Sequence, residues 1–199
     1  MVETASLASI VTALAPADQE RVREYIAFLR WRGGPAADLT GPAQPERIWR
    51  FSFLEHFAAA DIRASRDAAG MEVKIGEATV GGERRPALWQ HPPVLGESRA
   101  EFHVPVPAGL RAPGARLRFN IGMRDGAQTT DGLVAYRVRV DGWQIWSRAA
   151  WPAAWQSFEI GLPFQTGNIL RLTFATDALG SHPFAWAVWG EPELVGATD

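Results

Sequence analysis

The chain has 199 residues, of which 47% are hydrophobic and 21% are charged, and its formal net charge is -2. This is the composition of an ordinary globular protein, and it argues against a nucleic-acid or anionic-membrane surface because those partners select a basic excess. The lack of cysteine excludes disulfides, thiolate metal ligands and a thiol nucleophile. The N-terminus carries acidic Glu3 where a signal peptide is basic, and no apolar run reaches the roughly 18 residues of a membrane span, so we expect a cytoplasmic location.

The beginning of the chain predicts two helices. Apolar residues recur at helical spacing in two runs, Leu7, Ile10, Val11 and Leu14, then Val22, Ile26 and Leu29. Pro16 suits the first turn of the second helix, and Gly33-Gly34 ends it. We therefore assign residues 1–32 to a helical hairpin. Its apolar stripe either covers the following domain or docks a partner or a second copy of the chain, which would make a homo-oligomer.

A linker and a β domain are predicted to follow. Residues 33–47 contain three Gly and three Pro and no apolar periodicity, which is typical of a linker. In the domain assigned to residues 48–199, WRFSF alternates like a strand, and the Ala-rich LEHFAAADIRA predicts a short helix. The runs MEVKIGEATV and RPALWQ predict strands around a turn at Gly81-Gly82, and His91-Pro92-Pro93 predicts an extended segment outside a ladder.

Alternation between apolar and polar residues becomes clear in the remaining strands. The expected core-facing sets are Ala100, Phe102, Val104 and Val106; Leu117, Phe119, Ile121 and Met123; Phe158, Ile160 and Leu162; and Leu170, Leu172 and Phe174. Many short strands bounded by turn residues indicate a mainly β fold, an antiparallel β-sandwich (jelly roll) with the N-terminal helical hairpin attached. The side chains expected inside are Phe102, Phe119, Val138, Phe158, Leu172 and Trp186.

The pair Asp141-Gly142 predicts a β-hairpin, because both residues of such a tight turn need a positive φ. A two-residue turn pairs Val140 with Trp143, Val138 with Ile145 and Arg137 with Trp146. One face of the hairpin would then be apolar and include Val134, Tyr136, Val138, Val140, Trp143 and Ile145. The other face would carry Arg137, Arg139, Gln144 and Trp146.

Several segments resemble a known family of jelly-roll domains. They are ALWQHPP before a strand that ends in VPVP, LRFNIGMRDG, DGLVAYRVRVDG, ILRLTFATD and the closing WAVWGEPEL, which together cover about Arg85 to Val195. This combination resembles the galactose-binding-like fold, including the NPCBM-type carbohydrate-binding modules and related domains attached to bacterial glycosyltransferases. The resemblance implies glycan recognition. Those relatives often carry an acidic residue before the last tryptophan strand, whereas this chain has Ala185 before Trp186, so one carboxylate of that pattern is absent.

The candidate binding residues are aromatic and planar polar side chains, because sugars are held by flat rings against their C–H faces and by groups that satisfy several hydroxyls at once. Trp151 and Trp155 bracket Pro152 in a connection between strands, where a ring either stacks on a sugar or plugs the end of the sandwich. Trp146 either forms a cation-π contact with the neighbouring arginines or belongs to a binding surface. The predicted ligand-binding set is Trp151, Trp155, Arg124, Asp125, Asp131 and Trp146.

The loop MRDGAQTTDG, which supplies Arg124, Asp125 and Asp131, has the turn chemistry of loops that bind sugars or calcium. It lacks the spacing of an EF-hand, so we expect no cofactor and keep calcium as the alternative. Outward positions on the central strands form a second, mixed-charge set that is basic on balance. It is either a solvated face or a surface for an acidic glycan or an acidic protein, and it contains Glu101, His103, Arg118, Asn120, Arg137, Arg139, Glu159 and Arg171.

No catalytic motif is present. The four histidines, His56, His91, His103 and His182, occur without HExxH, GxSxG or P-loop sequences. A glycosidase pair drawn from Glu55, Glu101, Asp125, Asp131 and Glu159 stays open, because it needs only geometry. We therefore predict a noncatalytic domain that recognises a glycan or a glycan-processing protein. The alternative is a structural or assembly protein that uses the β-sandwich as a scaffold and the helical hairpin for self-association.

Overall fold

The computed structural model describes residues 47–110, 114–128, 132–162, 169–180 and 183–198, together with Ala15, Asp18, Gln19 and Val22. The chain divides into two units, Met1–Gly41 and Pro42–Asp199. In the first unit, Asp18, Gln19 and Val22 are helical, and the N–H groups of Asp18 and Gln19 donate to the Ala15 carbonyl. Apart from these residues, the predicted hairpin of residues 1–32 lies outside the described residues, as does the linker before Arg47.

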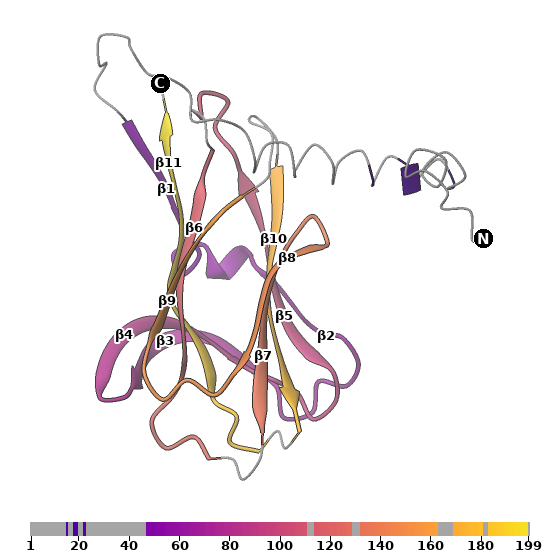
Figure 1. Cartoon of the computed structure of the whole chain (residues 1–199), viewed down its shortest axis with the longest axis vertical. Helices are drawn as coiled ribbons and strands as arrows, with labels where there is room; N and C mark the ends of the chain where they lie inside the picture. The colour runs from indigo at the N-terminus through magenta and orange to yellow at the C-terminus, as the bar shows by residue number, and fades with distance from the viewer. Residues whose placement is uncertain are drawn as a thin grey trace, which may run out of the picture. The chain divides into compact units, whose positions relative to one another are not determined.

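The second unit contains two antiparallel sheets (Figure 1). Sheet A has the order β3 (Glu72–Val80), β4 (Glu83–His91), β11 (Ala187–Thr198), β6 (Arg116–Met123) and β9 (Gln156–Gly161), and β1 (Arg47–Ser52) also pairs with β11. Sheet B has the order β2 (Asp61–Ala64), β5 (Glu97–Pro105), β10 (Ile169–Leu179), β7 (Leu133–Val140) and β8 (Trp143–Ala150). The described residues include no helix long and apolar enough to cross a membrane.

The strand order is that of a jelly roll. From β4 onward the chain crosses repeatedly between the sheets, and this produces the arrangements β4-β11-β6-β9 and β5-β10-β7-β8. The prediction of a mainly β, antiparallel sandwich is therefore confirmed. The strand predicted from Trp49 is β1, and LEHFAAADIRA forms one turn of 3-10 helix, Phe57–Ala59, followed by β2.

One apolar core lies between the sheets. As predicted, Phe102, Phe119, Val138 and Leu172 are buried in it, and Phe158 packs against it half-buried. The prediction that Trp186 lies inside is wrong, because Trp189 takes that place and is fully buried. Side chains alternate along β11, so Ala187 and Trp189 face the core while Val188 packs in a separate cluster with Ala78, Val80 and Ala87.

The tight turn of the predicted hairpin is confirmed, with φ of 50° at Asp141 and 87° at Gly142. Val140 pairs with Trp143 and Arg139 with Gln144, but a bulge then makes Val138 pair with Trp146 and Arg137 with Ser147. The extra residue reverses the direction of the following side chains. Trp146 therefore points into the core, 4.9 Å from Phe119 and 4.8 Å from Phe158 between ring centroids, and not to the face that carries Arg137 and Arg139.

Trp143, which the uninterrupted register placed on the apolar face, is also different in the structure. It lies directly after the turn and is 46% exposed. The arginines of β7 lie on the outer face of sheet B, as predicted. The bulge therefore changes the predicted side-chain directions in β8 only.

Candidate functional site

Two of the predicted binding residues, Asp125 and Trp155, converge on the β3–β4 turn. The carboxylate of Asp125 accepts hydrogen bonds from the N–H groups of Gly81 at 2.7 Å and Gly82 at 3.0 Å. Trp155 donates from Nε1 to the Glu83 carbonyl at 2.9 Å. These bonds tie three connections together at one end of sheet A, and they occupy both carboxylate oxygens and the indole N–H with contacts inside the protein.

The Trp155 ring packs over sheet A. A Cβ added to Gly190 would lie 2.8 Å from this ring, and one added to Gly122 would lie 3.1 Å from it, so the two glycines make room for the indole. Trp155 also packs against the cluster that contains Val80 and Val188, which identifies the outer face of sheet A as the surface that it covers. Trp155 is therefore half-buried, and its ring has a structural role in covering this face of the sheet.

Arg124 lies between two other aromatic rings. Its guanidinium is 3.5 Å from the centroid of Trp89 and 5.4 Å from that of Trp186, which are cation-π contacts. Partial burial lowers the pKa of Arg124, with Glu72 acting in the opposite direction. Sequence reasoning selected the arginine but not these aromatic partners, because they come from β4 and from the segment before β11.

The other three predicted residues do not join this group. Trp151 is half-buried and packs against the main core, and Trp146 points into it. Asp131 lies outside the described residues. The six predicted residues therefore do not form one site. The connection that contains Trp151 and Trp155 and the loop that contains Arg124 both contact the β3–β4 turn, through Trp155 and Asp125.

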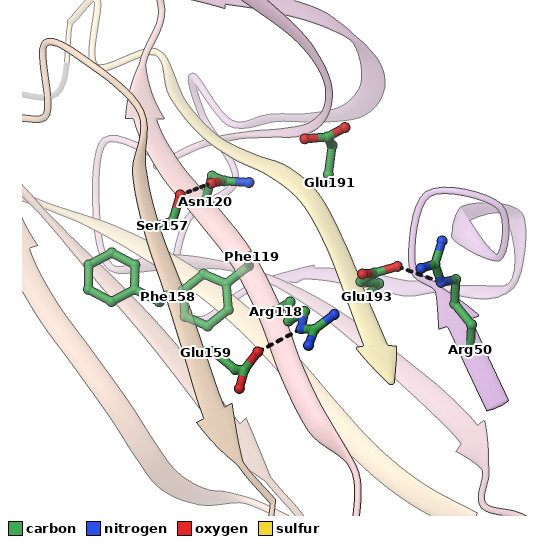
Figure 2. Close-up of a pocket in the computed structure, with 9 residues that line it drawn as sticks. All are labelled: Arg50, Arg118, Phe119, Asn120, Ser157, Phe158, Glu159, Glu191 and Glu193. Atoms are coloured by element: carbon green, nitrogen blue, oxygen red, sulfur yellow. Dashed lines mark hydrogen bonds and ion pairs between the residues drawn. The ribbon is translucent and has the colours of Figure 1, made fainter. Parts of the chain in front are cut away.

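A hollow of about 530 Å³ lies elsewhere on the outer face of sheet A (Figure 2). Its lining comes from β1, β6, β9 and β11 and from the bulge of β11. The lining residues are Arg50, Arg118, Phe119, Asn120, Ser157, Phe158, Glu159, Glu191 and Glu193. The two phenylalanine rings pack in the core, so the alternation of β6 and β9 turns the polar neighbours of Phe119 and Phe158 toward the hollow.

Facing strands fix the charged side of the hollow. Arg118 pairs with Glu159 across β6 and β9, and Nε of Arg118 donates to Oε2 of Glu159 at 2.7 Å. Arg116 donates to the other oxygen of Glu159. Hydrogen bonds from Arg116 and then Arg118 lower the pKa of Glu159, although burial acts against them. Glu159 therefore stays a carboxylate near neutral pH and presents acceptor oxygens.

The neutral side of the hollow is equally constrained. Asn120 donates from Nδ2 to the Gly190 carbonyl at 3.1 Å and accepts at Oδ1 from the Ser157 hydroxyl at 2.6 Å. The amide plane is thereby held in one orientation. Both Asn120 and Ser157 lie on the face of paired strands β6 and β9, where backbone hydrogen bonds keep their spacing constant.

A bulge in β11 shapes the third wall. Gly190 pairs with Asn120 and Glu193 with Arg118, so Glu191 and Pro192 lie opposite the single residue Phe119, and β11 carries one extra residue. Glu191 has a φ of 45°, an uncommon value for a residue with a side chain. Glu193 pairs with Arg50 at 3.0 Å and Glu191 with Arg85 at 3.4 Å. Bulges of this kind re-aim side chains and are frequent beside functional sites.

The hollow offers donors and acceptors at fixed positions and little reactive chemistry. Within the described ranges, no group of three His, Asp or Glu side chains could hold a metal ion. Sequence reasoning identified Arg118, Asn120 and Glu159 as outward residues but missed Arg50, Ser157, Glu191 and Glu193. The pattern of polar residues at alternate positions was the only available signal, and it does not show which strands are neighbours.

Comparisons with known proteins give a structural likeness only. No family model matches the chain, and no curated protein matches it. Solved structures that resemble it include CBM51 from the Clostridium perfringens GH95 in complex with methyl-galactose, with 11% identity, a TM-score of 0.48, and coverage of 73% of this chain and 99% of that one. TmCBM61 in complex with β-1,4-galactotriose has 16% identity, a TM-score of 0.44, and coverage of 72% and 92%.

The CBM22-1 xylan-binding domain from Paenibacillus barcinonensis Xyn10C has 11% identity, a TM-score of 0.45, and coverage of 79% of this chain and 99% of that one. The names of these three neighbours describe carbohydrate-binding modules or domains.

Proposed function

We propose that the protein is a noncatalytic carbohydrate-recognition domain and that it binds its sugar in the hollow of β1, β6, β9 and β11. The observation that carries this proposal is the set of fixed planar polar groups around an open space of about 530 Å³. That size lies within the roughly 300–1,000 Å³ of small-molecule sites. A domain of this kind would hold a glycan-processing partner close to its substrate.

The chemistry of the hollow suits hydroxyl groups. Each sugar hydroxyl both donates and accepts, and here the carboxylate of Glu159 accepts while the guanidinium of Arg118 donates, with the Asn120 amide nearby. Because internal hydrogen bonds already orient these side chains, little conformational entropy is lost when a sugar binds. Neighbouring donors and acceptors of opposite charge favour a neutral saccharide over a charged one.

A binding role fits the carboxylates better than a catalytic one. A glycosidase needs one carboxylic acid that is protonated near neutral pH. The arginine hydrogen bonds hold Glu159 in the ionised form, while Glu191 and Glu193 each pair with an arginine. The ionised Glu159 accepts hydroxyl hydrogens and has no proton to donate to a leaving group.

Isothermal titration calorimetry tests the proposal with a panel of neutral oligosaccharides: cellotetraose, xylotetraose, β-1,4-galactotriose and chitotetraose. Arg118→Ala should weaken binding about tenfold or more, because it removes a charge-assisted donor and leaves Glu159 held by Arg116 alone. Arg84→Ala is the matched control, since it breaks an Arg–Glu pair with Glu77 on sheet A outside the hollow. Equal binding by the wild type and Arg118→Ala would refute the site, and no heat with any of the four sugars would refute the function.

Self-association through residues 1–32 is the second candidate, supported by the apolar stripe in that sequence. Deletion of residues 1–32 should change the oligomeric state measured by analytical ultracentrifugation. The same number of subunits with and without residues 1–32 would argue against assembly through this segment.

A further inference from the structure

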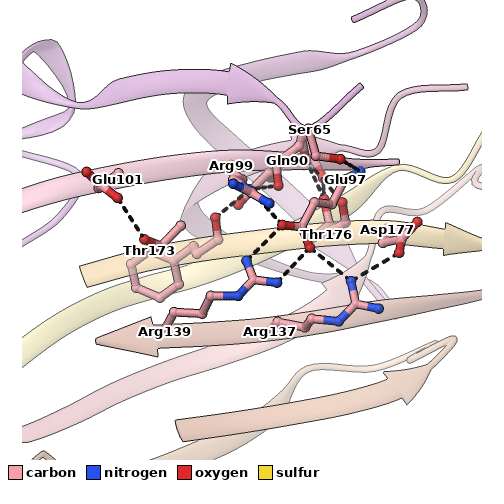
Figure 3. A network of polar contacts seen from close by, with 12 residues as sticks. Ser65, Gln90, Glu97, Arg99, Glu101, Arg137, Arg139, Thr173, Thr176 and Asp177 are labelled. Carbon is pink, nitrogen blue, oxygen red and sulfur yellow. Dashed lines mark hydrogen bonds and ion pairs between the residues drawn. The ribbon is translucent and has the colours of Figure 1, made fainter. Parts of the chain in front are cut away.

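A second hollow, of about 380 Å³, lies on the outer face of sheet B. Its lining is rich in arginine and contains Ser65, Arg66, Gly96, Glu97, Arg99, Arg137, Arg139 and Asp177. Figure 3 shows Arg137 and Arg139 reaching from β7 toward Glu97, which lies on β5, with Asp177 on the strand between them. None of these residues takes part in the hollow on sheet A.

Glu97 organises the arginines. It is only 6% exposed, and its two oxygens accept from both terminal nitrogens of Arg139 at 2.8 Å, from Nε of Arg99 at 2.5 Å and from Arg137 at 3.1 Å. Burial would raise the pKa of Glu97, but the hydrogen bonds from Arg139 and Arg99 lower it overall. One buried carboxylate thus fixes the direction of three guanidinium groups.

The backbone brings these residues together with little freedom. Ala175 pairs with Arg99 on one side and with Arg137 on the other, so a small side chain separates the two arginines. Gly96 has a φ of 86°, and a Cβ there would lie 2.4 Å from Oγ of Ser65, which accepts from the Glu97 N–H at 2.9 Å. Glu97 is therefore anchored at its backbone as well as at its side chain.

The positive charge exceeds what the two carboxylates neutralise. Four arginines line the hollow together with Glu97 and Asp177. Arg66 is exposed and forms no ion pair with any residue in the described part of the chain. Arg99 donates to Glu97 through Nε, and its terminal nitrogens make no hydrogen bond to another described residue. The guanidinium groups of Arg66 and Arg99 thus offer hydrogen-bond donors to the hollow, while Arg137 and Arg139 are already paired with Glu97.

We propose that this hollow binds an oxyanion group, a carboxylate or a sulfate, carried by an acidic sugar. Guanidinium forks match the geometry of such groups, and a fork that is already oriented loses little freedom on binding. The hollow is of the size of a small-molecule site, and the chain's net charge of -2 disfavours a long polyanion that would contact much of its surface. This site does not depend on the neutral-sugar hollow of sheet A.

Titration calorimetry at low ionic strength with sodium galacturonate tests the proposal, with galactose and sodium sulfate as the comparison ligands. Galacturonate should bind more tightly than galactose, and added sodium chloride should weaken it because the attraction is screened. Arg99→Gln should weaken galacturonate binding about tenfold. Arg84→Gln is the control, because it removes an equal charge from a pair with Glu77 on sheet A, away from this hollow.

Each result decides between this proposal and another explanation. Equal losses in Arg99→Gln and Arg84→Gln would mean that only the overall charge matters, and no galacturonate binding at millimolar concentration would also overturn the proposal. Sulfate that binds as tightly as galacturonate would overturn the assignment to a sugar, since the sugar ring would then contribute nothing. If Arg99→Gln fails to fold, Arg66→Gln provides the same test at an exposed position. Arg118→Ala should leave galacturonate binding unchanged, which separates this site from the one on sheet A.

Discussion

Replacement of Trp189 by alanine tests the register of β11 and the position of the core. The indole is fully buried, and its ring lies 4.9 Å from Phe174, 5.3 Å from Tyr136 and 5.4 Å from Phe119 between centroids. A buried tryptophan covers roughly 200 Å² of surface, and at about 25 cal/mol per Å² this corresponds to about 5 kcal/mol. Core Trp→Ala substitutions cost about 3–5 kcal/mol by measurement, so we expect a loss near 4 kcal/mol in the free energy of unfolding.

Urea unfolding followed by far-ultraviolet circular dichroism measures this loss without relying on the fluorescence of the removed ring. Trp186→Ala is the control, because Trp186 lies just before β11, is half-buried and contacts Arg124 and Phe184. It should lose about 1–2 kcal/mol, as partial burial and one cation-π contact imply. A larger loss for Trp186→Ala than for Trp189→Ala would refute the alternation that we describe for β11.

Two further predictions concern pH and packing. Burial lowers the pKa of His91 from 6.5 to about 4, with Glu72 opposing the shift, so the folded state favours the neutral ring. The stability that neutral His91 contributes is complete above about pH 6.5 and is lost as the pH falls toward 4, by about 2 kcal/mol at pH 5. Urea unfolding at pH 7.5 and at pH 5 should show this loss in the wild type and not in His91→Leu. Equal losses in the two proteins would contradict the role of His91. Gly190→Ala should lower the free energy of unfolding by about 1–3 kcal/mol, because the new methyl group meets Trp155. Gly76→Ala is the control: its nearest contact would be at 3.7 Å, so the melting temperature should be unchanged or slightly raised. Equal effects of the two substitutions in differential scanning calorimetry would show that the Trp155 ring moves aside without loss of stability.

The strands were predictable because their alternation is local information. The core-facing set of Ala100, Phe102, Val104 and Val106 is buried as expected, and so is the set of Leu117, Phe119, Ile121 and Met123. The turn at Asp141-Gly142 was predictable because its residues are those that adopt a positive φ. The bulge that follows was not, since no residue type requires it, and one additional residue changed the side on which Trp146 lies.

The binding surfaces were harder to predict because they depend on which strands become neighbours. Arg118 and Asn120 were identified as outward residues, but Glu193 and Arg50 reach them from segments far away in the sequence through the pairings of β11 with β6 and β1. The loop residues Arg124 and Asp125 gave a clearer signal in the sequence, and their contacts turn out to connect the β3–β4 turn to the rest of sheet A.

Nuclear magnetic resonance mapping of the bound sugar is the most direct test of the central claim, that the sheet A hollow recognises a carbohydrate. Amide chemical shifts of the ¹⁵N-labelled protein would be followed during titration with each of the four neutral oligosaccharides named above. We predict that the largest shifts occur at Asn120, Ser157 and Glu193 and that Arg118→Ala reduces them. Shifts confined to the β3–β4 turn or to sheet B, or no shifts at millimolar sugar, would contradict the claim.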